Sequence, residues 1–199
     1  MIMDYNKLLK NKLNQKFYLE ETEIVAKNLI GKLFIKKDNN SLLIARITET
    51  EAYLDQNDES SHSCKGITNR NKSMFMIGGT LYVYFIYGVH YCVNIVTKDE
   101  GKGAAVLIRA AEPLAGIEIM KQNRKIHNFE KLLIGPGNFA KAFNFNKNDD
   151  GKSLLSNDIF ISDDNYSTEI ITTERIGISK STNLQLRFYD RNSKFVSKK

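Results

Sequence analysis

The chain has 199 residues, of which 42% are hydrophobic and 26% charged, as expected for one soluble globular domain. Its two cysteines form no CxxC pair, which argues against a disulfide scaffold or a structural zinc site and suits a reducing compartment. The net charge of +6 is compatible with a nucleic-acid partner, and no stretch approaches the ~20 apolar residues of a membrane span. We therefore expect a cytoplasmic protein, associated with the nucleoid if bacterial.

The first third of the chain alternates between polar segments and apolar patterns. Residues 1–16 are rich in Lys and Asn and predict a polar arm, either loosely held or folded as a short surface helix. Helical spacing follows at 21–30, with Gly31 expected just past the helix end and a strand at 33–37. A turn at 38–41 leads to a long strand at 42–53, and the polar residues 54–73 predict an irregular loop.

Three consecutive strands are predicted next, at 80–86, 91–98 and 104–110, with turns between them. Helices are expected at 114–125 and at 134–145, the second beginning at a Gly-Pro-Gly turn, and short strands at 158–162, 169–178 and 186–190. Strands joined by tight turns favour antiparallel pairing. The fold class predicted is α+β: one compact domain at 17–199, with a curved, mixed but mostly antiparallel sheet, packed helices and a protruding β-hairpin.

Common catalytic motifs are missing from the chain. It has no GxxxxGK[ST], GxGxxG, HExxH or GxSxG sequence, so phosphate-loop, dinucleotide, zinc-protease and serine-hydrolase chemistry lack their usual parts. The segment LLIGPGNFAKAF is a short match to helix-hairpin-helix elements, whose Gly-rich turn binds a phosphate through backbone N–H groups. Turn geometry explains the same glycines equally well.

The predicted hairpin at 80–98 is unusually rich in polar aromatic side chains. Such residues favour strands regardless of function, but a tyrosine also offers a flat face and a polar tip suited to nucleobases. A three-residue loop at 87–89 would place Tyr84, Cys92 and Asn94 on one face, whereas a two-residue loop would put Asn94 on the other. In both arrangements Tyr87 lies at the tip.

The strand at 42–53 ends in a run of acids, ITETEAYLDQNDE. A run of charges usually faces water, yet in a regular strand Glu49, Glu51 and Tyr53 share one face. Arg109, at the end of an apolar strand, either extends outward to solvent or points at a carboxylate on a neighbouring strand.

Taken together, the motifs ETEAY, ESSH, NRNKSMFM, GTLYVYFIYG, CVNI and LIRAAEPL resemble the alkyladenine (3-methyladenine) DNA glycosylases. The resemblance runs from Phe17 to the segment LRFYD at 186–190 and is densest between Arg46 and Pro113. It implies a monofunctional enzyme that flips a damaged purine nucleotide out of duplex DNA and hydrolyses its N-glycosidic bond, leaving an abasic site. It also implies a monomer that uses no metal or other cofactor.

The resemblance assigns the hydrolysis to a glutamate and an arginine. Glu51 would be the general base that activates the attacking water, and Arg109 would help to hold that water and the carboxylate. An adjacent arginine is expected to lower the pKa of the glutamate and keep it ionised. The remaining acids Asp55, Asp58 and Glu59 are then expected to be solvated loop residues.

The resemblance also assigns the binding of the base. Tyr53, His62 and Tyr84 would form the walls between which the flipped base stacks, with a hydrogen bond from His62. Asn94 would hinder normal guanine through its exocyclic amino group. Tyr87 would enter the minor groove and fill the gap left by the flipped nucleotide.

Two other readings remain to be weighed. A non-catalytic nucleic-acid-binding domain would keep the basic charge and the aromatic hairpin, but would not need a carboxylate beside an arginine. A formyltransferase-like RNA-modifying domain would need a folate-binding module, which the sequence does not show. Because the loop at 64–71 and the residues after the hairpin tip differ from the family pattern, no particular lesion is predicted.

Overall fold

The computed structural model describes residues 4–38 and 41–199 and places its strands in a single curved sheet. The main path of the sheet has the order β3-β4-β5-β2-β1-β6, while β8 pairs with β2 and with β7. The strands are β1 (Leu33–Asp38), β2 (Ser41–Tyr53), β3 (Leu81–Ile86), β4 (His90–Thr97), β5 (Ala104–Ala115), β6 (Ile159–Ser162), β7 (Ile170–Thr173) and β8 (Arg187–Asp190). Every pairing among these strands is antiparallel.

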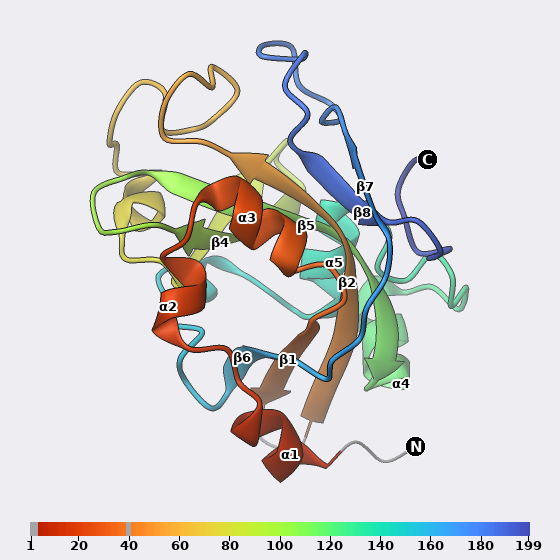
Figure 1. Ribbon diagram of the computed structural model, residues 1–199. Helices are drawn as coiled ribbons and strands as arrows, with labels where there is room; N and C mark the ends of the chain where they lie inside the picture. Colours follow the sequence, from red (N-terminus) through yellow and green to blue (C-terminus); the bar gives the residue numbers. More distant parts are fainter. Residues whose placement is uncertain (1–3, 39–40) are drawn as a thin grey trace.

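Short helices surround this sheet (Figure 1). They are α1 (Tyr5–Lys10), α2 (Gln15–Tyr18), α3 (Thr22–Asn28), α4 (Ile117–Arg124) and α5 (Pro136–Ala142), with 3-10 turns η1 (Lys72–Phe75) and η2 (Lys147–Asp149). Helix α3 packs on β2 and β5, and α5 packs on β4, β5 and α4. This arrangement confirms the predicted α+β class with a mostly antiparallel curved sheet.

Alternation along the strands divides the sheet into two faces with different tasks. In β3, β4 and β5 one set of side chains enters the main hydrophobic core, for example Val83, Val93 and Ile108. The intervening residues, such as Tyr84 and Asn94, point to the opposite face. The core face therefore stabilises the fold, and the other face is free to carry polar and aromatic groups.

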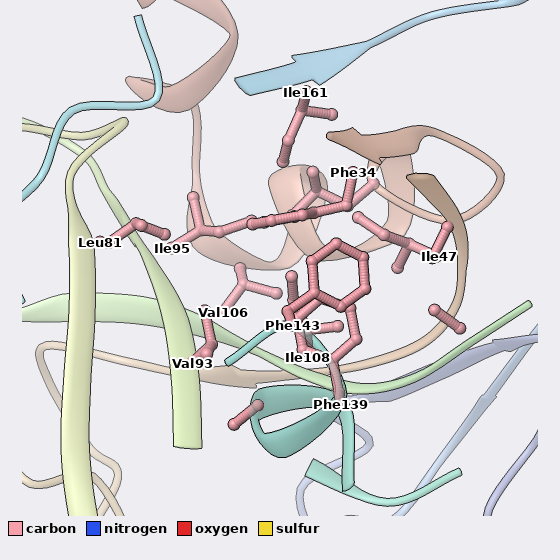
Figure 2. Packing of buried hydrophobic residues seen from close by; sticks show 14 of the residues in the cluster. Phe34, Ile47, Leu81, Val93, Ile95, Val106, Ile108, Phe139, Phe143 and Ile161 are labelled. Atoms are coloured by element: carbon pink, nitrogen blue, oxygen red, sulfur yellow. The ribbon is translucent and has the colours of Figure 1, made fainter. Parts of the chain in front are cut away.

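The main core is closed by aromatic residues from α5 and β1 (Figure 2). The ring of Phe34 meets Phe139 edge-on with a centroid separation of 5.3 Å, and Phe143 in the same way at 5.6 Å. Pro136 occupies the first turn of α5, so the predicted Gly-Pro-Gly helix start is confirmed. Because Phe139 on α5 is packed in this core, the core fixes the position of the Gly-Pro-Gly turn at which α5 begins.

The polar arm at residues 1–16 contains α1 and the first two residues of α2. Leu8 of α1 is buried in a second, smaller cluster with Leu33, Ile35 and Phe160. The side chain of Lys12 donates to the backbone oxygen of Leu155 at 2.8 Å. The first described residues thus form a helix that packs on β1 and β6, while a domain boundary at residue 17 stays a prediction.

Some predicted bounds are wrong. Strand β5 continues to Ala115, so Leu114 belongs to a strand, and α4 begins only at Ile117, after Gly116 with φ of 73°. Pro113 is tolerated because β4 pairs only with residues 104–107 of β5, which leaves its position facing no ladder on that side. The strand predicted at 169–178 ends at Thr173. The predicted turn at 38–41 falls largely on residues 39 and 40, outside the described part of the chain.

Candidate active site

The centre of the candidate site lies where β2 and β5 pair irregularly. The register shifts between Ile47 and Glu49 and again between Glu49 and Thr50, so that neither Thr48 nor Arg109 has a partner directly opposite. Such bulges re-aim side chains next to functional sites. Here they leave Arg109 between two carboxylates of β2.

Arg109 contacts both carboxylates. Its Nη1 lies 3.2 Å from Oε2 of Glu51, and its Nε lies 3.3 Å from Oε1 of Glu49. Glu49 is held further by Arg187, whose Nε lies 2.7 Å from Oε1, and by the backbone N–H of Ser197 at 2.7 Å from Oε2. Of the two orientations left open for Arg109, the structure shows the one that points at a carboxylate. Glu49 was missed as a partner of Arg109, although its shared face with Glu51 was the signal.

Glu51 is completely buried and well supplied with hydrogen bonds. Its Oε2 accepts from the Tyr53 hydroxyl at 3.0 Å as well as from Arg109, and its Oε1 accepts from the backbone N–H of Ile176 at 2.7 Å. A carboxylate offers about four lone-pair positions. Oε1 therefore retains acceptor capacity for a further donor.

Burial raises the pKa of Glu51 above its ordinary value, although Arg109, the Ile176 N–H and the Tyr53 hydroxyl each lower it; the charge of Glu49 raises it further. Arg109 lowers the pKa of Glu51 as expected, but removing the carboxylate from water outweighs this and the other favourable contacts, so the net pKa is raised. A base with a raised pKa binds a proton more strongly, which suits general base chemistry near neutral pH.

An aromatic pocket of about 310 Å³ lies on the same face of the sheet. Its walls include Tyr53, His62, Tyr84 and Asn94. The ring of His62 meets that of Tyr84 with a centroid separation of 4.6 Å, and its Nδ1 lies 2.9 Å from the Tyr82 hydroxyl. The structure thus brings together the predicted base-binding residues around a space large enough to admit a flat heterocycle.

The polar groups of this pocket are held in defined states. Asn94 is buried, and its Nδ2 donates to the backbone oxygen of Tyr82 at 3.1 Å. Desolvation and the charge of Arg70 lower the pKa of His62, so this ring is neutral at pH 7. A neutral imidazole has one donor and one acceptor nitrogen, and can therefore hydrogen-bond a heterocycle as well as Tyr82.

A second hollow of about 380 Å³ adjoins the pocket and shares Tyr53, Tyr84 and Gly177 with it. Arg109 and the turn at residues 135–137 line this hollow, together with Tyr87 of the hairpin. We refer to the two hollows, which share these walls, together as the groove. Of the Glu51–Arg109 pair, Arg109 lines the groove, and Tyr87 at the tip of the β3–β4 hairpin lines it at the side away from His62 and Asn94.

The hairpin has the three-residue loop that was one of the two alternatives. Ile86 pairs with His90, and Tyr84 with Cys92. At the tip, Tyr87 is 82% exposed and has a φ of 54°, a conformation that is uncommon for a bulky residue and recurs at functional sites. Gly88 follows with a φ of 69°. The structure therefore presents a large aromatic side chain on a tight turn at the end of the groove.

Two of the acids expected in solvent are not solvated. Asp58 is 3% exposed and forms a bidentate ion pair with Arg175, at 2.6 and 2.7 Å. Asp55 accepts from Lys98 at 3.4 Å and is mostly buried at its side chain. Only Glu59 fits the expectation, with a side chain 71% exposed. The sequence offered no local sign of the partner of Asp58, because Arg175 lies 117 positions away.

Among the described residues, no group of three or more His, Cys, Asp or Glu side chains is placed to hold a metal ion. The part of the chain that the structure describes likewise has no helix long and apolar enough to cross a membrane. What the site does combine is a buried carboxylate, a guanidinium and an aromatic pocket. This combination is suited to cleaving a bond to a flat heterocycle.

Comparison with known proteins identifies the class. Residues 16–194 match the family described as methylpurine-DNA glycosylase. A provisionally named 3-methyladenine DNA glycosylase of Francisella tularensis subsp. tularensis (strain FSC 198) is 47% identical over 179 residues, covering 87% of this chain and 92% of that protein. A protein of the same name from Chlorobium phaeobacteroides (strain BS1) is 42% identical over 191 residues, covering 94% of this chain and 96% of that protein.

The chain therefore belongs to the methylpurine-DNA glycosylase family. It is a DNA-repair glycosylase that removes alkylated bases, which confirms the predicted enzyme class and family. The alternative of a non-catalytic nucleic-acid-binding domain is not favoured.

Proposed function

We propose that the chain flips alkylated or deaminated purine nucleotides out of duplex DNA and hydrolyses their N-glycosidic bond with Glu51 as general base. The observation that carries the proposal is the Glu51–Arg109 pair, with Nη1 and Oε2 at 3.2 Å, beside an aromatic pocket. The product is an abasic site and a free base. The protein acts as a monomer and without a cofactor.

The pocket supports a role in holding the extruded purine. Tyr53, His62 and Tyr84 line it, and base stacking on aromatic side chains contributes about 1–3 kcal/mol per base while tolerating different bases. Asn94 lies on the pocket wall with its amide fixed by the Tyr82 backbone. The exocyclic amino group of guanine would meet this amide, so normal guanine is disfavoured.

The carboxylate supports the hydrolytic step. Cleavage of the bond leaves positive charge on the sugar, which a nearby carboxylate stabilises. The water oxygen forms a bond to C1′, and its proton passes to Glu51, whose Oε1 accepts from the Ile176 N–H and has room for a further donor. A base alkylated on a ring nitrogen carries a positive charge, so it departs with the bonding electrons as a neutral molecule; an uncharged deaminated base departs as its anion and takes up a proton from water. Arg109 borders the groove and contacts Glu51, which supports a role in holding the water.

The hairpin tip supports a role in flipping. Extruding a nucleotide costs a few kcal/mol of stacking and pairing, and a side chain inserted into the duplex offsets part of that cost. Tyr87 is the most exposed of the large hydrophobic residues described and stands at the end of the groove. We assign to it the filling of the gap that the flipped nucleotide leaves.

A base-release assay tests this function. Duplex oligonucleotides containing 3-methyladenine, hypoxanthine or ethenoadenine are incubated with the protein, and free base and abasic sites are measured. We expect release from at least the alkylated substrate, with an undamaged duplex as control. Tight binding of all these duplexes without release of any base would refute the hydrolytic function.

A further inference from the structure

A buried ion pair lies directly behind the candidate site. The side chains of Arg175 and Asp58 are both 0% exposed, and the guanidinium meets the carboxylate with two bonds of 2.6 and 2.7 Å. Bidentate pairing of this kind fixes orientation as well as distance. A buried pair is in itself weak evidence for stability, since desolvation opposes the attraction, so its position calls for another explanation.

Asp58 organises the loop that leads from one wall of the pocket to the next. Its Oδ2 accepts from the backbone N–H of Leu54 at 3.0 Å, and its Oδ1 from that of Ser60 at 3.1 Å. Leu54 directly follows Tyr53, and Ser60 lies two positions before His62. One carboxylate therefore ties together the backbone on both sides of this loop.

Arg175 reaches the catalytic strand in two ways. Its Nη1 donates to the backbone oxygen of Ala52 at 2.9 Å, and its Cζ lies 4.7 Å from the ring centroid of Tyr53. The next residue, Ile176, donates its N–H to Oε1 of Glu51 at 2.7 Å. The guanidinium thus contacts a wall of the pocket and anchors the backbone that holds the carboxylate.

We infer that Arg175, locked by Asp58, is a positioning residue for Glu51 and Tyr53. This inference rests on the proposed role of Glu51 as general base. Arg175 touches no reacting atom, and it acts through the Ile176 N–H and through the face of the Tyr53 ring. Because the hydrogen bond from the Ile176 N–H lowers the pKa of Glu51, loosening this hydrogen bond raises that pKa.

The test compares Arg175→Lys with wild type. Lysine keeps the charge but loses the planar fork and the stacking surface. Release of 3-methyladenine is measured under single-turnover conditions between pH 5 and 9, together with the affinity for the damaged duplex. We expect the rate at saturating enzyme to fall about tenfold to a hundredfold, the effect of misplacing a reacting group. The acid limb of the profile should move to higher pH, and the affinity should change little.

Arg46→Lys is a matched control. Arg46 also forms a bidentate pair, with Asp164 at 2.8 and 2.7 Å, and also covers a ring, that of Tyr166 at 4.2 Å. It lies in the first half of β2 and belongs to none of the groups that form the candidate site. Arg46→Lys should therefore leave the rate and its pH profile unchanged.

Asp58→Asn carries the test if Arg175→Lys does not fold, because it preserves the shape of the side chain and one acceptor oxygen. It should lower the rate and move the acid limb in the same direction. A folded Arg175→Lys or Asp58→Asn variant with the rate and pH profile of wild type overturns the positioning role. The same holds if the variant loses thermal stability but keeps that rate and profile. Activity of Glu51→Gln, assayed in parallel, would instead overturn the proposed base.

Discussion

Replacing Glu51 by glutamine is the most direct test of the chemistry. The substitution preserves volume and leaves no cavity, but an amide cannot take up the proton of the attacking water. Glu51 accepts from Tyr53 and Arg109 on Oε2 and from Ile176 on Oε1. Glutamine has a single acceptor oxygen, so one of these sets of donors loses its partner while the rest of the site is retained.

The size of the effect follows from these contacts. A general base contributes about 10²–10⁴-fold in rate, which corresponds to about 2.7–5.4 kcal/mol of activation free energy. Because the side chain of Glu51 is 0% exposed, DNA does not contact it in the binding step. We therefore expect the rate of base release to fall by this factor, with the affinity for the damaged duplex nearly unchanged.

The assay is single-turnover release of 3-methyladenine with enzyme in excess, and binding is measured separately by fluorescence anisotropy. Glu118→Gln is the control, since Glu118 lies on α4 with its side chain 78% exposed and pairs with Lys121 on the same helix. It should behave as wild type. A Glu51→Gln rate within threefold of wild type would refute the reasoning and remove Glu51 from the mechanism.

The remaining predictions concern charge, flipping and cofactors. Arg109 lowers and Glu49 raises the pKa of Glu51, and the base acts when it is ionised. The acid limb of the rate profile should therefore move to higher pH in Arg109→Gln and to lower pH in Glu49→Gln. Shifts of both variants in the same direction would contradict this reasoning. Tyr87→Ala should shift the equilibrium from the extruded toward the stacked nucleotide by about 1–3 kcal/mol, seen as a lower extruded fraction of a fluorescent base analogue at saturating protein. The salt dependence of binding, which phosphate contacts set, should stay unchanged. A wild-type extruded fraction would show that Tyr87 has no role in flipping. Base release should persist in EDTA, and borohydride should trap no DNA adduct; loss of activity on chelation or a trapped Schiff base would show a metal or a lysine nucleophile.

Much of the site could be predicted because it depends on the period of a strand. Each candidate loop length fixed which hairpin residues share a face, and the three-residue loop of the structure puts Tyr84 and Asn94 on one face. The shared face of Glu49 and Glu51 follows from the same alternation. The alternation within a strand is local and could be predicted from the sequence pattern, whereas the choice between the two loop lengths came from the structure.

The rest depends on contacts between distant segments. Asp58 stands in a polar loop that looks solvated, and only the folded chain brings Arg175 to it across 117 positions. Ile176 was predicted within a strand, but β7 ends at Thr173, and this irregular backbone is what frees an N–H for Glu51. No local periodicity signals such a contact.

The charges around Glu51 show how the fold keeps a base usable while burying it. Glu49 and Glu51 are opposed by Arg109 and Arg187, so the cluster of four is neutral overall, and Arg109 is shared between the two acids. A dedicated partner would hold the pKa of Glu51 low and make it a weak base. Sharing leaves desolvation dominant, and the pKa of Glu51 is raised. A carboxyl whose folded pKa is raised contributes stability at acid pH that is lost as pH rises through that pKa. Holding Glu51 ionised at neutral pH therefore opposes folding, and the donors at Tyr53, Arg109 and Ile176 are what limit that cost.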